Sequence, residues 1–137
     1  MIAVDTSALM AILLGEPEAD GCADLLEAED RLLISAATVA ETLIVAEMRG
    51  IGGEMARLID GLGFEVEAVT PAQALQVAEA YRRWGNGRHP AGLNFGDCFA
   101  YALAMQHGCR LLFVGQDFAR TDVEACALAP QSGSGPS

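Results

Sequence analysis

Short apolar runs along the chain predict the strands of a sheet. Ile2–Val4 is apolar throughout and too short to alternate, as in a strand buried on both faces. Residues 64–69 (FEVEAV) alternate between apolar and acidic, which indicates an edge strand with one face in water. Further strands are expected at 31–36 (RLLISA), at 110–114 (RLLFV) and, as a last short strand, at 123–128.

Helical segments lie between these runs, and polar capping residues and glycines predict their ends. Thr6 or Ser7 can cap the first helix, which Gly15 ends. Thr70, followed by proline, and Asn94 are placed to cap the last two helices. The expected helices cover 6–14, 17–29, 38–48, 54–62, 71–84 and 94–107.

The alternation of strands and helices predicts an α/β fold. Helical crossovers between parallel strands cover both faces of a sheet, so we expect three layers, α/β/α, with a mostly parallel central sheet of four or five strands. Residues 1–129 are assigned to one domain, and residues 130–137, rich in Gly and Ser, are expected to be a disordered tail. Ligands of such sheets bind beyond the carboxyl ends of the strands, where the strand order reverses.

Composition supports one domain with an aliphatic core. The chain has 137 residues, and 52% of them are hydrophobic, which excludes an intrinsically disordered protein. No apolar stretch reaches the length that a bilayer requires, and the N-terminus lacks a basic leader, so we expect a cytoplasmic protein without a membrane segment. Cys22, Cys98, Cys109 and Cys126 have no metal-site spacing and are expected to be free thiols.

The charge is strongly negative. The chain contains nineteen Asp and Glu residues and eight basic residues, all of them arginine, which gives a formal net charge of −11. A protein this acidic repels phosphate, so binding of nucleic acid requires divalent cations or a basic partner that reverses the local sign. The absence of lysine excludes a P-loop.

Four carboxylates fall at the expected carboxyl edge of the sheet. Asp5 follows the first strand, Glu41 lies in the first turn of the helix after the second strand, and Asp97 lies in the first turn of the last helix. Asp117 lies just past the strand at 110–114. Crowded carboxylates repel one another, and a hard divalent cation relieves this repulsion. An all-oxygen set favours Mg²⁺ or Mn²⁺ over zinc.

Each of these carboxylates also has a local explanation. Glu41 completes a capping-box pattern with Thr38, and Asp5 is placed to cap a helix. Asp97 favours the positive end of a helix dipole, and Asp117 lies in a turn, where aspartate is common. Only their shared edge favours a metal site, so both explanations stay open at this point.

Four motifs occur in a fixed order along the chain. They are VDTSAL at 4–9, AET at 40–42, LNFGDCFAYA at 93–102 and LLFVGQDF at 111–118. This series resembles the PIN-domain ribonucleases, most closely the VapC toxins of VapBC toxin–antitoxin pairs, over residues 2 to about 123. The resemblance implies a three-layer PIN-like fold.

The resemblance also implies roles for individual residues. The implied metal-binding and catalytic residues are Asp5, Glu41, Asp97 and Asp117. Thr6 or Ser7 would orient the first aspartate, and Asp122 would lie outside the direct ligands. Gln116 departs from the Asn or Asp that relatives often have, which puts the support of the last ligand in doubt.

The activity implied by the resemblance is that of a Mg²⁺- or Mn²⁺-dependent endoribonuclease toxin of a type II toxin–antitoxin system. Metal-activated water would hydrolyse RNA, with tRNA or rRNA as the substrate. Implied partners are a cognate antitoxin and a second copy of the chain, with no membrane, and with DNA reached only through the antitoxin. The alternatives are an RNA-processing nuclease that is not a toxin and a non-catalytic PIN-like module that binds RNA or protein.

A basic, glycine-rich segment precedes the last helix. Arg82, Arg83, Arg88 and His89 surround Trp84, the one tryptophan. Guanidinium and indole groups together can hold phosphate and stack an unpaired base. A solvated helix end, with the tryptophan over the core, explains the same residues, so their role stays open.

Overall fold

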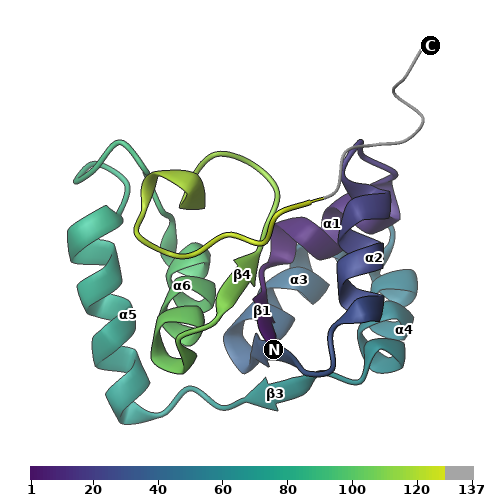
Figure 1. The fold of residues 1–137 in the computed structure, drawn as a ribbon, viewed down its shortest axis with the longest axis horizontal. Helices are drawn as coiled ribbons and strands as arrows, with labels where there is room; N and C mark the ends of the chain where they lie inside the picture. Colours follow the sequence, from purple (N-terminus) through teal and green to yellow (C-terminus); the bar gives the residue numbers. More distant parts are fainter. Residues whose placement is uncertain (129–137) are drawn as a thin grey trace.

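The computed structural model describes residues 1–128, which form a parallel sheet between two layers of helices (Figure 1). Within this range the sheet has four strands, in the order β3-β2-β1-β4, and every pairing is parallel. The strands are β1 (Ile2–Val4), β2 (Leu32–Ser35), β3 (Glu65–Glu67) and β4 (Arg110–Leu112). The predicted α/β fold with a parallel central sheet is confirmed, and β3 is an edge strand as expected.

Six α-helices and one short 3₁₀ helix join these strands in the described part of the chain. None of the helices there is long and apolar enough to cross a membrane. The elements are α1 (Thr6–Leu14), α2 (Ala19–Ala28), α3 (Ala36–Met48), α4 (Gly52–Leu62), α5 (Pro71–Trp84), α6 (Phe95–His107) and the 3₁₀ helix η1 (Phe118–Arg120).

Alternate residues of the buried strands face two separate cores. Ala3 and Leu111 belong to the core beneath α5 and α6, whereas Val4 and Leu112 belong to the core beneath α1, α2 and α4. Figure 1 shows α5 and α6 on one side of β1 and β4, and α2 and α4 on the other. Since both faces are covered, every residue of β1 and β2 is buried, and all of them except Ser35 are apolar.

The strand order reverses between β1 and β4. The chain runs outward from β1 through β2 to β3, and then crosses back to place β4 on the free side of β1. Val4 pairs with Leu112, and the amide of Asp5 donates to the Leu112 carbonyl at 3.0 Å. The segments that follow these two strands therefore run in different directions. The space between them is the usual position of a ligand in an α/β sheet.

Some predicted boundaries were wrong. The strand expected at 123–128 is a single bridge between Leu111 and Ala125, because only Leu111 exchanges hydrogen bonds with this segment. β4 ends at Leu112 rather than at residue 114, and α2 begins at Ala19 rather than at residue 17. The first helix is capped by Asp5 rather than by Thr6 or Ser7. The expectation for residues 130–137 lies outside the described residues.

Candidate active site

Asp5 lies at the point where the strand order reverses. It ends β1 and caps α1, and its Oδ2 accepts hydrogen bonds from the backbone amide of Ser7 at 3.0 Å and from the Ser7 hydroxyl at 2.7 Å. The residue is 3% exposed, and its other oxygen, Oδ1, is buried without a hydrogen-bond partner in the described part of the chain. An unpartnered buried carboxylate oxygen is costly, so Asp5 is poised to bind a proton or a cation.

Ser7 connects the segments that follow β1 and β4. Its hydroxyl donates to Asp5 and accepts from the amide of Val114, which follows β4, at 2.9 Å. Burial raises the pKa of Asp5 from its ordinary value of 3.8 to about 6, and the nearby charge of Glu41 adds to the rise. The hydrogen bonds from Ser7 oppose this shift because they favour the ionised carboxylate.

Glu41 lies in α3, which begins earlier than the sequence predicted. Ser35 caps the helix by accepting the Ala37 amide at 3.2 Å, so Thr38 lies inside the first turn and the expected capping box with Glu41 is wrong. Freed from that role, the Glu41 carboxylate accepts the hydroxyl of Thr6 at 2.7 Å through Oε1. Of the two hydroxyls expected near Asp5, Ser7 binds it and Thr6 binds Glu41.

Asp97 lies in the first turn of α6, where it has two functions. It forms a capping box with Asn94, whose amide donates to Asp97 Oδ2 at 3.0 Å while Asn94 Oδ1 accepts the Asp97 amide at 2.8 Å. Burial raises the pKa of Asp97 from 3.8 to about 7, opposed by the Asn94 hydrogen bond, and repulsion from Asp5, Glu41 and Asp117 adds to the rise. Asp97 thus has a local role at the start of α6, through a capping box that was not predicted from the sequence, and its charge still interacts with the other carboxylates.

Asp117 comes from the last segment of the site. It immediately precedes η1, is exposed, and makes no capping hydrogen bond through its side chain. Its charge is close enough to contribute to the raised pKa of Asp97. The four carboxylates thus occupy one edge of the sheet and influence one another, and each comes from a different element or connection.

Gly96 is a residue of this site that the sequence argument missed. A Cβ atom at this position would collide with the Glu41 carboxylate, so the bare backbone of α6 is what allows Glu41 to lie against it. A glycine in the first turn of a helix, directly before an aspartate, is the signal that could have identified it, because glycine there weakens the helix.

The carboxylates have the chemistry to bind a divalent cation, but they do not converge on one point. Within residues 1–128, no three His, Cys, Asp or Glu side chains converge closely enough to hold a metal ion. Yet Asp5 Oδ1 is unpartnered in the described residues, and burial, with a smaller contribution from neighbouring carboxylates, raises the pKa values of Asp5 and Asp97. Carboxylate oxygens are the ligands that Mg²⁺ and Mn²⁺ prefer.

Asp122 makes its contacts elsewhere. It accepts the hydroxyl of Tyr101 and lies 3.6 Å from the guanidinium of Arg83. Tyr101 in turn accepts the indole N–H of Trp84 at 3.0 Å. This network joins α5, α6 and the segment after η1, and it does not include the four carboxylates.

The sequence matches the PIN domain family over residues 2–124. The VapC30 ribonuclease of Mycobacterium tuberculosis is 43% identical over 128 residues, which cover 91% of this chain and 98% of that relative. A VapC ribonuclease of Mycolicibacterium smegmatis is 44% identical over 125 residues, which cover 89% and 97%.

Solved structures share the fold at lower sequence identity. VapC20 of Mycobacterium tuberculosis, a toxin that cleaves the sarcin–ricin loop, superposes with a TM-score of 0.72 at 21% identity, covering 90% of this chain and 96% of VapC20. A toxin–antitoxin complex from Klebsiella pneumoniae gives a TM-score of 0.66 at 19% identity, covering 89% and 93%. With the family match across nearly all described residues, the chain belongs to the PIN-domain family and, within it, to the VapC ribonucleases.

Proposed function

We propose that this VapC-family ribonuclease is a Mg²⁺- or Mn²⁺-dependent endonuclease that hydrolyses RNA and acts as the toxin of a type II toxin–antitoxin pair. The observation that carries the proposal is the unpartnered, buried Oδ1 of Asp5 at the reversal of strand order, next to the charge of Glu41. Membership of a ribonuclease family that depends on divalent metals supports it.

In this proposal Asp5 and Asp97 are the principal metal ligands, and Glu41 and Asp117 complete the set. A bound Mg²⁺ or Mn²⁺ would supply charge to bind the scissile phosphate and would lower the pKa of a water molecule. Asp122 is not assigned to this site, because its contacts are with Tyr101 and Arg83.

The remaining residues of the site hold these carboxylates in place. Ser7 keeps Asp5 in one rotamer through two hydrogen bonds, and Thr6 fixes Glu41. The capping box with Asn94 fixes the carboxylate of Asp97 while leaving its second oxygen free of protein donors in the described residues. Such positioning lowers the reorganisation that catalysis requires.

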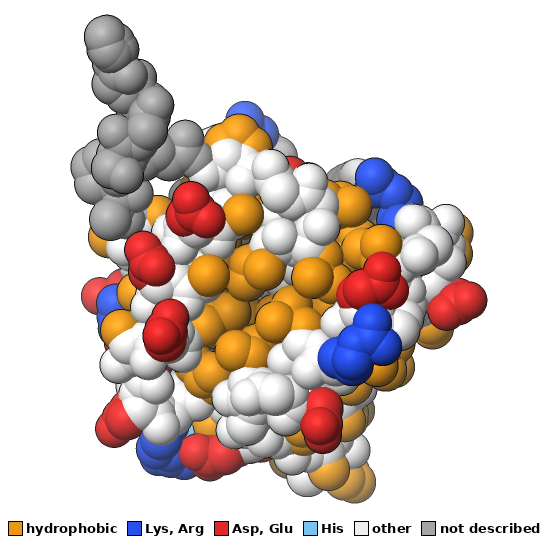
Figure 2. Space-filling model, turned by 90° about the vertical axis from the view of Figure 1, so that its right-hand side faces the viewer, with side chains coloured by type: hydrophobic (Ala, Val, Ile, Leu, Met, Phe, Trp, Pro, Cys, Tyr) orange, Lys and Arg blue, Asp and Glu red, His pale blue; other side chains and the backbone are white. Residues whose placement is uncertain are grey.

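An apolar face supports the proposed antitoxin partner. Figure 2 shows hydrophobic side chains gathered in the middle of one face of the molecule, with acidic side chains along one margin. Apolar residues of α1, α2 and α4 pack against one core and remain partly exposed to solvent; they are Ile12, Leu13, Leu14, Leu25, Leu58, Ile59 and Leu62. Solved relatives include toxin–antitoxin complexes from Klebsiella pneumoniae and Rickettsia felis, and we assign this face to an apolar segment of the antitoxin.

A second apolar surface supports the proposed homodimer. Ile44 on α3 and Phe95 on α6 line one apolar groove and are 61% and 72% exposed, and Met48, one helical turn after Ile44, is 79% exposed. Large exposed side chains of this kind mark a contact surface. We place the protein in the cytoplasm, in keeping with the free state of all four cysteines.

A divalent-metal titration against RNA tests the proposed activity. Purified protein is incubated with tRNA, rRNA and a sarcin–ricin loop oligonucleotide over a range of Mg²⁺ and Mn²⁺ concentrations, with EDTA as a blank. Cleavage is expected only with metal and is lost in Asp97→Asn, whereas the control Asp24→Asn, an exposed residue of α2, cuts like the parent. Binding without cleavage at any metal concentration would instead indicate the non-catalytic alternative.

A further inference from the structure

Half of the arginines of this protein are neutralised by ion pairs within the fold. The chain has eight arginines and no lysine, and all eight lie in the described residues. Four of them pair with carboxylates. The pairs are Arg31–Glu65 at 2.8 Å, Arg110–Glu29 at 3.1 Å, Arg83–Asp122 at 3.6 Å and Arg82–Glu79. Arg82 and Arg83, two candidates for RNA contact, are therefore engaged within the protein.

The four arginines without an ion pair in residues 1–128 fall into two groups. Arg49 follows α3 and Arg57 lies on α4. Arg88 lies in the loop that connects α5 to α6, and Arg120 ends η1. All four are exposed.

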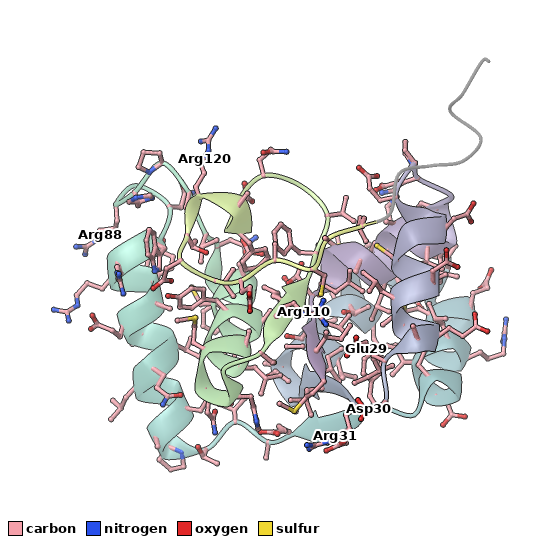
Figure 3. The ribbon with its side chains drawn as sticks, in the orientation of Figure 1. Glu29, Asp30, Arg31, Arg88, Arg110 and Arg120 are labelled. Atoms are coloured by element: carbon pink, nitrogen blue, oxygen red, sulfur yellow. The ribbon has the colours of Figure 1, made fainter. Side chains whose placement is uncertain are left out.

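Arg88 and Arg120 lie beside the candidate active site. In Figure 3 Arg120 lies at the upper edge, toward which β4 points in Figure 1, and Arg88 lies at the upper left, beside the end of α5, whereas the paired Arg31 and Arg110 lie lower, with Glu29 and Asp30. Arg120 follows Asp117 by three residues, and its amide donates to the Asp117 carbonyl at 3.4 Å. The loop with Arg88 leads directly into Asn94, the residue that holds Asp97.

Internal contacts hold the two loops in position. The Arg120 guanidinium donates from Nη1 to the Pro90 carbonyl at 3.1 Å, which ties η1 to the α5–α6 loop. Within that loop the Arg88 amide donates to the Gly85 carbonyl at 2.9 Å, and His89 packs edge-on against Trp84 with ring centroids 4.7 Å apart. Because these contacts hold the backbone of the loop, the loop needs little rearrangement for Arg88 to bind a ligand.

We propose that Arg88 and Arg120, in two segments that the Arg120–Pro90 hydrogen bond joins, bind phosphates of the RNA strand next to the scissile bond. The inference rests on the proposed function, because it names how that same site retains its substrate. A protein of net charge −11 repels RNA, and the four carboxylates repel it most strongly at the point of cleavage. Of the four unpaired arginines in residues 1–128, these two lie in the connections that adjoin Asp97 and Asp117.

The test compares two double variants that remove the same charge. Arg88→Gln/Arg120→Gln removes the proposed contacts, and Arg49→Gln/Arg57→Gln removes two exposed, unpaired arginines on α4 and at the end of α3. The probe is a labelled, unstructured single-stranded RNA of about twenty nucleotides, long enough for several phosphate contacts. Fluorescence anisotropy with Ca²⁺ in place of Mg²⁺ reports binding over a salt series, and thermal melting checks that each variant folds.

Loss of the two contacts is expected to weaken RNA binding about tenfold at low salt, and to reduce the slope of log Kd against log salt by about 1.4, since each phosphate contact to a single strand contributes about 0.7. The Arg49/Arg57 control should bind within twofold of the parent. Arg88→Lys/Arg120→Lys, which keeps the charges, should recover most of the affinity.

Two results would overturn the proposal: equal weakening in both double variants, which would show a general charge effect, and a parent protein that does not bind the probe. Cleavage in Mg²⁺ or Mn²⁺ is scored separately. A parent that binds through these arginines but never cuts would refute the proposed function and leave this inference standing. If the parent cuts RNA and Arg88→Gln/Arg120→Gln binds and cuts RNA normally, the proposed function is supported and this inference is refuted.

Discussion

Replacement of Asp97 by asparagine is expected to increase the stability of the metal-free protein and to abolish RNA cleavage. Burial and the charges of Asp5, Glu41 and Asp117 raise the pKa of Asp97 from 3.8 to about 7. At about 1.36 kcal/mol for each pH unit, this difference corresponds to about 4 kcal/mol of native-state destabilisation when the carboxylate is ionised. The amide is uncharged and nearly the same shape, and its oxygen can still accept the Asn94 amide. Without metal at pH 8, Asp97→Asn should therefore be more stable than the parent, by up to about 4 kcal/mol.

The pH dependence of this gain has a definite sign. Because the pKa of Asp97 is higher in the folded than in the unfolded protein, the folded parent takes up a proton as the pH falls from about 7 toward 3.8. The parent thus becomes more stable over this window, while the variant has no such proton to bind. At pH 5 the advantage of the variant should shrink to less than half of its value at pH 8.

Urea unfolding in EDTA at pH 8 and pH 5, followed by circular dichroism, measures both values. RNA cleavage in Mn²⁺ is measured on the same preparations and should be lost in Asp97→Asn. The reasoning is refuted if the variant is less stable than the parent at pH 8, or if its gain is the same at both pH values. The exposed Asp24→Asn control should show neither effect.

Three further changes test other parts of the site. Gly96→Ala should displace the Glu41 carboxylate and reduce RNA cleavage about a hundredfold. The stability of the helix should be kept or increased, because alanine is favoured over glycine in a helix by about 0.5–1 kcal/mol. A variant that cleaves RNA like the parent contradicts this prediction. Ser7→Ala removes a hydroxyl that donates to Asp5 and accepts from Val114, and it should cost about 1–3 kcal/mol in urea unfolding, with unchanged stability as the contrary result. Mn²⁺ at a hundred times its Kd should stabilise the parent by about 2.7 kcal/mol in thermal melting, reversibly with EDTA, and the absence of any shift would count against the metal site.

Much of the fold could be predicted because its local signals agree with its tertiary contacts. Ile2–Val4 was identified with its observed bounds, since only a strand covered on both faces is apolar at each position. Asn94 and Gly108 bracket α6 as expected, because one supplies a capping oxygen and the other adopts a positive φ of 59°. The carboxyl-edge rule for parallel sheets then placed the four carboxylates on one side of the molecule.

Other features depend on contacts that the sequence does not encode locally. Ser35 and Thr38 are both suitable caps, and the end of β2 at Ser35 decides between them. The partner of Thr6 is Glu41, which is 35 residues away, and no spacing rule predicts such a pair. Asp122 was expected outside the direct ligands, and its contacts with Tyr101 and Arg83 join segments that no spacing rule brings together.

The chain order of the sheet has a consequence for a toxin made by the cell that it harms. β4 is the last strand along residues 1–128, yet it pairs with β1, and the segment after it carries Asp117. A nascent or proteolysed chain that stops before residue 110 contains Asp5, Glu41 and Asp97 but lacks one wall of the site. The candidate site is thus complete only when residues 110–117 have been made and β4 has paired with β1.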